Sequence, residues 1–188
     1  ISVCEDDELL HLMKESGCAQ ILIGFESPVA NGLNGLELHS NWKRKHFDIY
    51  RQAIEKIQDH GITVNGCFVL GLDNTDTSSF ERIWEFVNES GLFEVQITVL
   101  TAFPGTPLYK RLKEEGRILH DGMWEMCTLF DVNFRPSNMS VSDLESGLRM
   151  LGERLYSSEF TAARRKRFFD RLRGRTRNPI STHQGGMA

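Results

Sequence analysis

The sequence has few cysteines, and the four that it has lie far apart. Cys4, Cys18, Cys67 and Cys127 form no pair with the short spacing of a zinc or redox motif. A chain of 188 residues is long enough to bury a core without a disulfide scaffold, so we expect each cysteine to be a small buried apolar residue. Scattered cysteines of this kind favour the cytoplasm as the compartment.

Other signals are missing as well. No apolar run approaches the roughly 20 residues that a transmembrane helix needs, and no stretch is typical of a secretory signal. The six histidines have no spacing that suggests a zinc site, and the sequence contains neither a nucleophile elbow nor a phosphate-cradling loop. The chain begins at Ile1, inside an apolar segment and without an initiator methionine, and we therefore expect a fragment of a longer protein.

Charge is distributed unevenly along the chain. The net charge is −4, but residues 159–188 hold eight Arg/Lys and two Asp/Glu and carry +6. A basic helix with Phe168 and Phe169 in it suits RNA, an anionic membrane surface or an acidic partner domain. A solvated helix that runs into a partly disordered terminus is the simpler interpretation. We therefore expect a basic tail over residues 164–188 and no clear nucleic-acid site.

Hydrophobic periodicity predicts alternating strands and helices. Short apolar runs bounded by turn residues predict buried strands at 19–27, 62–73 and 93–100, and the opening ISV is interpreted as the end of another. Helices that each end at a glycine are predicted over 5–17, 43–61 and 77–91. Repeated β-α-β units predict a parallel sheet, either open or curled into a barrel. In both architectures the ligand binds at the carboxyl ends of the strands.

Polar and glycine residues at these strand ends are candidates for a site. Glu26 directly follows the apolar run ILIGF, so we expect its carboxylate at the rim of the site, unless it caps a helix or forms a salt bridge. Gly66 and Gly71 bracket an apolar segment, which means that neighbouring side chains need the room or that a planar ligand lies against the backbone. Asp73 and Asp76 are interpreted as turn and cap residues rather than calcium ligands.

The last predicted strand ends in a stiff loop, Phe103-Pro104-Gly105-Thr106-Pro107. Its two prolines fix φ and remove two N–H donors, while the glycine permits a backbone that other residues resist. The loop is either a strand-to-helix turn or a preformed wall for a flat ligand.

Three segments, in this order and at these spacings, resemble the second half of the radical S-adenosylmethionine (radical SAM) core domain. They are ILIGFES, GITVNGCFVLGLDNTDTSSFE and VQITVLTAFPGTPLYKRLKEEGRIL. The later stretch DVNFRPSNMSVSDLESGLRMLGERLYSSEFTAARR is similar to a small C-terminal domain in one branch of these proteins. Members with a cobalamin-binding domain ahead of the radical core are the most similar. The resemblance covers nearly all of residues 1–170.

The resemblance implies an α/β fold that is a partial (β/α) TIM-type barrel. Residues 1–116 would hold about strands three to six, residues 117–163 a small C-terminal domain, and residues 164–188 the basic tail. In this family the adenine of S-adenosylmethionine would lie against Val69, Gly71, Ala102, Phe103 and Pro104.

Three further cofactor contacts are implied, together with one departure from the family. Glu26 or Ser27 would meet the ribose or methionine part of S-adenosylmethionine, and Lys43 lies where a basic residue often meets the methionine carboxylate. The family's CxxxCxxC motif, whose thiolates hold a [4Fe–4S] cluster, is absent from this sequence. The cluster-binding half, and a possible cobalamin-binding domain, would then precede Ile1 in the same polypeptide.

The implied function is that of a radical SAM enzyme fragment, inactive alone. The parent would reductively cleave S-adenosylmethionine at the [4Fe–4S] cluster, and then abstract hydrogen from a small-molecule or lipid-like substrate or transfer a methyl group through cobalamin. One alternative is a non-catalytic binding module that has lost the cluster half and uses the strand-end cleft or the basic tail to bind a partner or RNA. An unrelated barrel enzyme with a phosphate-bearing substrate would need a basic or glycine-rich helix start, which is missing.

Overall fold

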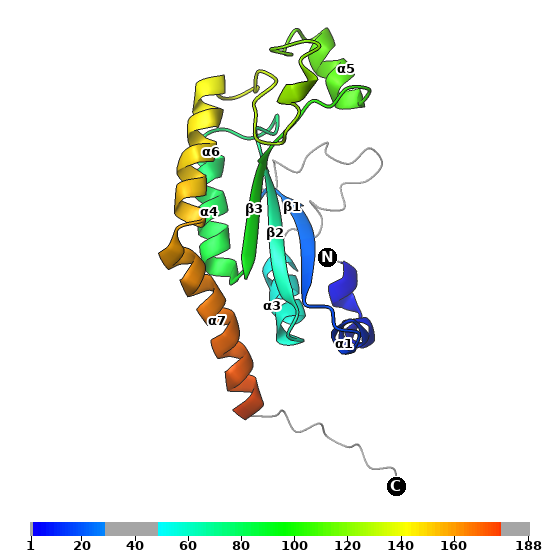
Figure 1. Ribbon diagram of the computed structural model, residues 1–188, viewed down its shortest axis with the longest axis vertical. Helices are drawn as coiled ribbons and strands as arrows, with labels where there is room; N and C mark the ends of the chain where they lie inside the picture. Colours follow the sequence, from blue (N-terminus) through cyan, green and yellow to red (C-terminus); the bar gives the residue numbers. More distant parts are fainter. Residues whose placement is uncertain (1, 29–48, 178–188) are drawn as a thin grey trace.

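The structure is a computed structural model that describes residues 2–28 and 49–177 (Figure 1). Its elements follow one another as η1 Ser2–Glu5, α1 Asp7–Glu15, β1 Gln20–Glu26, α3 Tyr50–Asp59, β2 Thr63–Leu70, α4 Ser78–Ser90, β3 Glu94–Val99, α5 Pro107–Glu114, η4 Trp124–Met126, α6 Val141–Leu155 and α7 Ser158–Arg177. The fold is α/β, and none of the described helices is long and apolar enough to cross a membrane.

The three strands form one parallel sheet in the order β1-β2-β3. Gly66 in the central strand pairs with Ile23 on one side and with Val95 on the other. The predicted strands, and the helices between them, are therefore confirmed within the described residues. The interpretation of ISV as the end of a strand is wrong, because residues 2–5 form a 3-10 helix. The chain turns there, since the Asp6 side chain caps α1 by accepting the Leu9 N–H at 2.9 Å.

One face of the sheet packs against helices. Alternate residues of β2 and β3 are buried on this face, and α3 and α4 lie against it. The centre of this core is aromatic, with the Phe25 ring 4.9 Å from Tyr50 and 5.8 Å from both Phe68 and Phe86. Each fully buried side chain of this size contributes about 1.5–3 kcal/mol.

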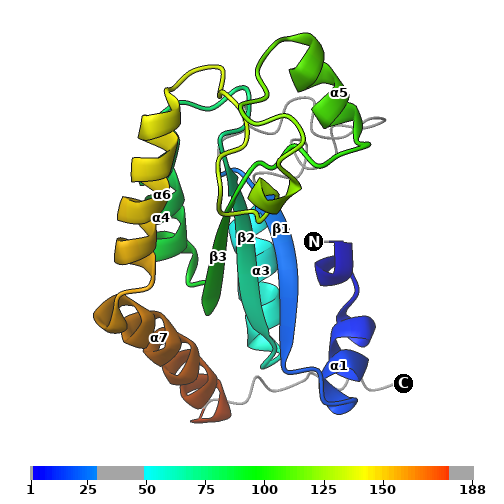
Figure 2. The same ribbon diagram turned by 45° about the horizontal axis from the view of Figure 1, so that its top comes forward.

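The opposite face of the sheet is polar and half exposed. Asn65 and Cys67 of β2 and Gln96 and Thr98 of β3 alternate with the buried residues, and Leu22 of β1 is 62% exposed. Figure 2 shows α3 behind the strands and the short η4 in front of their upper ends, whereas no described α-helix lies in front of them. Strands of a barrel have helices on one face only, whereas an open doubly wound sheet has them on both. Three strands do not close a barrel, so the partial barrel stays a prediction.

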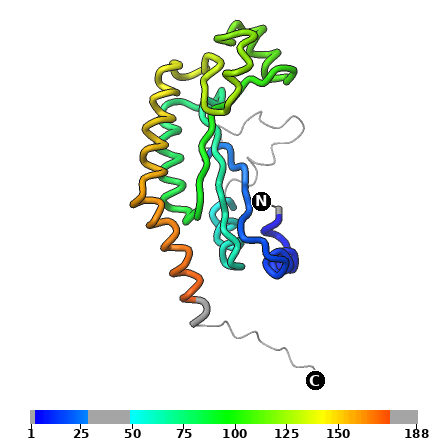
Figure 3. The backbone as a smooth tube through the Cα atoms, in the orientation of Figure 1, coloured from blue at the N-terminus to red at the C-terminus, as the bar shows by residue number. Residues whose placement is uncertain are grey.

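The C-terminal part of the chain folds back along the same helical layer. The capping box of Ser140 and Asp143 starts α6, which packs on α4, and α7 continues past β3 to α3 (Figure 3). The expected boundary between residues 163 and 164 falls inside the continuous helix α7. Residues 178–188 lie outside the described residues.

The basic helix α7 is held by the chain's own acidic groups. Arg165 forms an ion pair with Glu94 at the start of β3, and Arg171 pairs with Asp59 at 2.6 Å. Arg164 is 1% exposed and donates to the backbone carbonyl of Phe93 at 3.0 Å. These described cations contact acidic groups and carbonyls of the same chain, and an external partner for the helix stays a prediction.

Candidate functional site

The carboxyl ends of the three strands meet at one edge of the sheet, at the top of Figure 1. The register pairs Glu26 with Phe68, and Val69 with Thr98. Predicted site residues from β1, β2 and the loop after β3 are therefore at the same edge, as parallel pairing requires. Lys43 lies outside the described residues.

Glu26 ends β1 in a strained conformation. Its φ is +63°, which is rare for a residue with a side chain, and the Ser27 N–H donates to the Phe25 carbonyl at 2.8 Å across it. This γ-turn follows an irregularity of the β1–β2 register between Gly24 and Glu26. Such backbone strain costs about 1–3 kcal/mol and persists only where the surroundings hold it. The residue before it, Phe25, is fully buried and packs against three other aromatic rings.

Bulges at strand ends commonly change the direction of a side chain, and the register shift before Glu26 is of this kind. Burial, and then the negative charge of Glu26, raise the pKa of the Cys67 thiol on the polar face of the sheet. On that face the Cys67 Sγ is 3.7 Å from Gln96 Oε1. Ser27, the next residue, is 2% exposed. The end of β1 thus presents a carboxylate beside a row of half-buried polar side chains.

The two glycines of the β2 segment leave room for neighbouring side chains. A Cβ at Gly66 would lie 2.7 Å from Leu92 Cδ1, and one at Gly71, where φ is +82°, would lie 2.8 Å from Leu144 Cδ2. On the Cβ side of both glycines, neighbouring side chains therefore occupy the space, which is the first of the two interpretations that the sequence left open. Val69 is half buried on the polar face. Contact of Gly71 or Val69 with an adenine stays a prediction.

The loop after β3 is a well-bonded strand-to-helix turn. Thr106 caps α5 by accepting the Tyr109 N–H at 3.2 Å, Pro107 begins the helix, and Gly105 has a φ of +78°. These features account for the residue types in the loop. Phe103 and Pro104 are exposed, and their side chains are what the loop offers to a ligand.

Ala102 is fully buried, and its backbone is already bonded to a side chain. Its N–H donates to Asn133 Oδ1 at 3.1 Å, and its carbonyl accepts from Asn133 Nδ2 at 3.3 Å. A base edge that used the Ala102 N–H would have to replace Asn133. Sequence reasoning missed this clamp, because 31 residues separate the two partners.

Asp73 is a second residue whose role the sequence did not reveal. Its carboxylate accepts from Arg111 at 2.6 Å, Arg117 at 2.8 Å and Ser137 at 2.9 Å, and its carbonyl accepts from Asn138 at 2.6 Å. The end of β2 is thereby tied to α5 and to the segment before α6. The partners lie 38 or more residues further along the chain, so the local turn signal was the only one visible.

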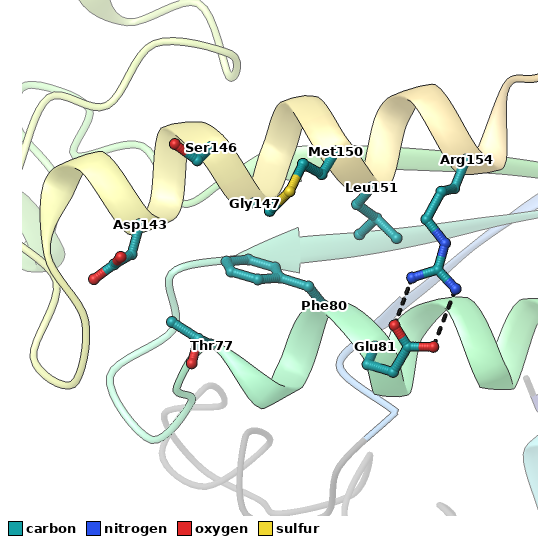
Figure 4. A pocket seen from close by; sticks show the side chains of 9 residues that line it. All are labelled: Thr77, Phe80, Glu81, Asp143, Ser146, Gly147, Met150, Leu151 and Arg154. Carbon is teal, nitrogen blue, oxygen red and sulfur yellow. Dashed lines mark hydrogen bonds and ion pairs between the residues drawn. The ribbon is translucent and has the colours of Figure 1, made fainter.

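A hollow of about 410 Å³ lies elsewhere, between α4 and α6 (Figure 4). Phe80 and Gly147 meet inside it, and the Arg154–Glu81 ion pair closes one end. No residue predicted for the site lines it.

The described residues contain no group of three or more His, Cys, Asp or Glu side chains that could hold a metal ion. The four cysteines are free, and Cys4 is buried, whereas the other three are half buried. The expectation that each is buried is therefore correct for Cys4 alone. The described part of this chain therefore offers no ligand set for a [4Fe–4S] cluster.

Comparison with known proteins finds methyltransferases. The family described as "Domain of unknown function (DUF4070)" matches residues 106–187. The hopanoid C-2 methylase of Rhodopseudomonas palustris is 30% identical over 121 residues, which are 64% of this chain and 22% of the relative. The bacteriochlorophyllide d C-12(1)-methyltransferase of Chlorobaculum tepidum is 26% identical over 149 residues, 79% of this chain and 31% of the relative. The chain thus spans about a fifth to a third of these curated relatives.

Proposed function

We propose that the chain forms the second half of the radical core of a cobalamin-dependent methyltransferase. The support is its membership of the radical SAM superfamily, together with the methyltransferases to which it is similar. In this proposal the three strands are part of a (β/α) barrel, and the cluster ligands belong to a preceding part of the same polypeptide. The substrate is a large, mostly apolar small molecule, since two relatives are named for a hopanoid and a bacteriochlorophyllide.

The observation that carries this proposal is the strained turn at Glu26. A glutamate in a positive-φ γ-turn destabilises the fold, and such strain is concentrated at ligand sites. The turn lies at the carboxyl end of a parallel strand, and no described α-helix covers the polar face of the sheet. In a barrel this face would be the interior, where a cofactor and a substrate would meet.

The residues at the strand ends suit parts of S-adenosylmethionine. The Glu26 carboxylate is placed to accept hydrogen bonds from ribose hydroxyls, and Phe103 and Pro104 offer apolar surface to the adenine. The loop after β3, which the Thr106 cap and two prolines hold, lowers the ordering cost of binding. When bound, S-adenosylmethionine and a [4Fe–4S] cluster supply radical chemistry, and cobalamin supplies a transferable methyl group. The protein's part is to orient these groups and to exclude water.

Two substitutions of Glu26 test the proposal in the longer polypeptide after cluster reconstitution. In Glu26→Gln we expect S-adenosylmethionine affinity to fall by about 5- to 150-fold, the equivalent of about 1–3 kcal/mol, because hydroxyl donors lose a charged acceptor. In Glu26→Gly affinity falls as well, but the free energy of unfolding rises by about 1 kcal/mol because glycine adopts a positive φ without strain. Calorimetry and thermal unfolding give the two readouts.

Glu89→Gln is the matched control, since Glu89 is an exposed carboxylate that pairs with Arg51 on the helical layer. It should leave cofactor affinity unchanged. If both Glu26 variants bind S-adenosylmethionine as the parent does, the strand-end site is wrong. If the polypeptide neither binds a cluster nor cleaves S-adenosylmethionine, the enzyme proposal fails and the non-catalytic binding module takes its place.

A further inference from the structure

The outer edge of β1 carries backbone groups that no described strand pairs. On its inner side, the Thr63 N–H of β2 donates to the Ala19 carbonyl at 2.9 Å. Alternate residues of a parallel ladder bond to opposite neighbours, so Leu22 and Gly24 direct their N–H and C=O groups outward. Because β1 is the first strand of the sheet, these groups have no neighbour among the described strands. An edge of this kind is a template for another strand.

The helix before β1 lies with the helical layer. Lys56 of α3 forms an ion pair with Asp7 of α1 at 3.1 Å, and Lys14 Nζ of α1 donates to the Gly61 carbonyl at 2.8 Å. Leu22, in the middle of β1, is 62% exposed. The described part of the chain therefore leaves the middle of this strand open.

The outer edge of β3, in contrast, is bonded by the C-terminal part of the chain. The Ile97 N–H donates to the Tyr156 hydroxyl at 3.2 Å, and the Val99 N–H donates to the Leu129 carbonyl at 2.7 Å. Leu129 makes this contact at a φ of +70°, which is unfavourable for a bulky side chain and persists only where the surroundings fix it. The middle and the carboxyl end of this edge are thus satisfied within the chain.

The beginning of the same edge is held by a buried cation. Arg164 is 1% exposed and donates to the Phe93 carbonyl at 3.0 Å and to the Leu155 carbonyl at 3.2 Å. A buried guanidinium is costly to desolvate, so it requires fixed acceptors of this kind. We call Leu129, Tyr156 and Arg164 the edge seal. A further strand beside β3 would have to displace all three.

The edge seal lies within residues 106–187, the range that matches the domain of unknown function. We propose that this domain ends the sheet at β3, and that the preceding part of the polypeptide adds its strands only at the outer edge of β1, beginning with a parallel strand. The inference rests on the proposed function in one respect, because it takes the partner to be that preceding part. The chain covers only 22% and 31% of two curated relatives, which leaves ample length for such strands. A barrel built in this way does not close through β3.

Amide hydrogen exchange, followed residue by residue by NMR, tests the edge of β1. In the 188-residue chain we expect the amides of Leu22 and Gly24 to exchange at least about 100-fold faster than those of Ile21 and Ile23, which point to β2. In the longer polypeptide an added strand should slow Leu22 and Gly24 by at least about 100-fold. Ile21 and Ile23 are the internal controls and should be slow in both proteins.

The edge seal is tested in the 188-residue chain. The Ile97 and Val99 amides should exchange as slowly as the amides that point to β2, although β3 is an outer strand. Tyr156→Phe removes the hydroxyl that accepts from Ile97 and should speed exchange of that amide about tenfold or more, with Val99 unchanged. Tyr109→Phe is the matched control, because the Tyr109 hydroxyl donates to Asp121 instead, and it should change neither amide.

Three results in the 188-residue chain would overturn the inference. Rapid exchange of Ile97 and Val99 would mean that the edge of β3 is open. Equal acceleration of both amides by Tyr156→Phe would mean that the hydroxyl does not seal that edge. Slow exchange of Leu22 that depends on protein concentration would mean that a second copy of the chain pairs with β1.

The longer polypeptide separates this inference from the proposed function. If it cleaves S-adenosylmethionine while Leu22 and Gly24 still exchange rapidly, the inference fails and the proposed function stands. If the two amides are slow but the polypeptide neither binds a cluster nor cleaves S-adenosylmethionine, the proposed function fails, whereas the position of the added strand is confirmed.

Discussion

Asp73 joins segments that are distant in the sequence at the end of β2. Its carboxylate accepts hydrogen bonds from Arg117, Arg111 and Ser137, which lie in or after α5. Arg117 in turn donates to the Arg135 carbonyl at 2.7 Å, which holds the two sides of the loop together. Asp73 therefore ties the end of β2 to α5 and to the segment before α6.

The Asp73 network should make stability depend on pH. Burial raises the pKa of Asp73, but the hydrogen bonds from Arg117, Arg111 and Ser137 outweigh it and lower that pKa below its ordinary value near 4. A lowered pKa in the folded state means that the contribution is fully present above about pH 4 and is lost as pH falls through the folded-state pKa. We expect Asp73→Asn to cost about 1–3 kcal/mol at pH 7 and progressively less below pH 4. Urea unfolding at several pH values checks this, and a cost that stays constant with pH would contradict it.

Glu26 and the two glycines of the β2 segment show which features of single residues the sequence can predict and which it cannot. The strand pattern placed Glu26 at the carboxyl end of its strand correctly, because period-two burial and a following turn are local signals. Its positive φ could not be predicted, because it depends on the packing of Phe25 against rings from three other elements. The glycines were ambiguous for the same reason: Leu92 and Leu144, which fill their Cβ space, are distant in the sequence.

At the scale of elements, α6 and α4 approach each other closely at one glycine. A Cβ at Gly147 would lie 2.2 Å from Phe80 Cε2, so the aromatic ring lies directly on the backbone of α6 (Figure 4). The Arg154–Glu81 ion pair and the Arg154 guanidinium, 4.2 Å from the Trp84 ring, extend the contact along both helices. The C-terminal part is thereby fixed to the sheet layer through α4.

Two alanine substitutions in α6 should have opposite effects. Gly147→Ala adds helix propensity but forces the Phe80 ring away, so we expect a net loss of about 1–3 kcal/mol in the free energy of unfolding. Gly152→Ala, in the same helix, meets atoms no closer than 3.9 Å and should stabilise by about 0.5–1 kcal/mol. Denaturant unfolding of both variants measures the difference. Stabilisation by both would show that Phe80 does not pack on Gly147.

Element prediction succeeded where periodicity was strong and failed where few residues carried the signal. The helices and strands between residues 49 and 100 follow the apolar pattern, because one buried face determines each of them. The ISV segment has three residues, too few to distinguish a strand from a 3-10 turn. In α7 the composition suggested a solvated tail, whereas the buried Arg164, bonded to carbonyls of Phe93 and Leu155, fixes it to the fold.

At the scale of the whole molecule, contacts within the chain pair many of the basic side chains of α7 with acidic groups and carbonyls of the α/β unit. The basic helix α7 lies along the acidic α/β unit, with Arg171 reaching Glu55 and Asp59 of α3 and Arg167 reaching the Asn88 carbonyl of α4. Surface pairs of this kind are each worth little, so the buried Arg164 and Phe168 are the main reason why α7 stays docked. Within residues 2–28 and 49–177, the polar face of the sheet is the surface that no α-helix covers.

The reaction rate of the Cys67 thiol measures how accessible the polar face of the sheet is, and it therefore tests the proposed barrel. In the 188-residue chain its half-buried thiol should react slowly with a disulfide reagent, because burial and the Glu26 charge raise its pKa and the thiolate is the nucleophile. Glu26→Gln should speed the reaction.

In the longer polypeptide, further strands would cover this face and slow the reaction of Cys67 about tenfold or more. Cys18, beyond the opposite end of β1, is the internal control and should react equally in both proteins. If Cys67 reacts at the same rate in both, the face stays open and the partial barrel is wrong.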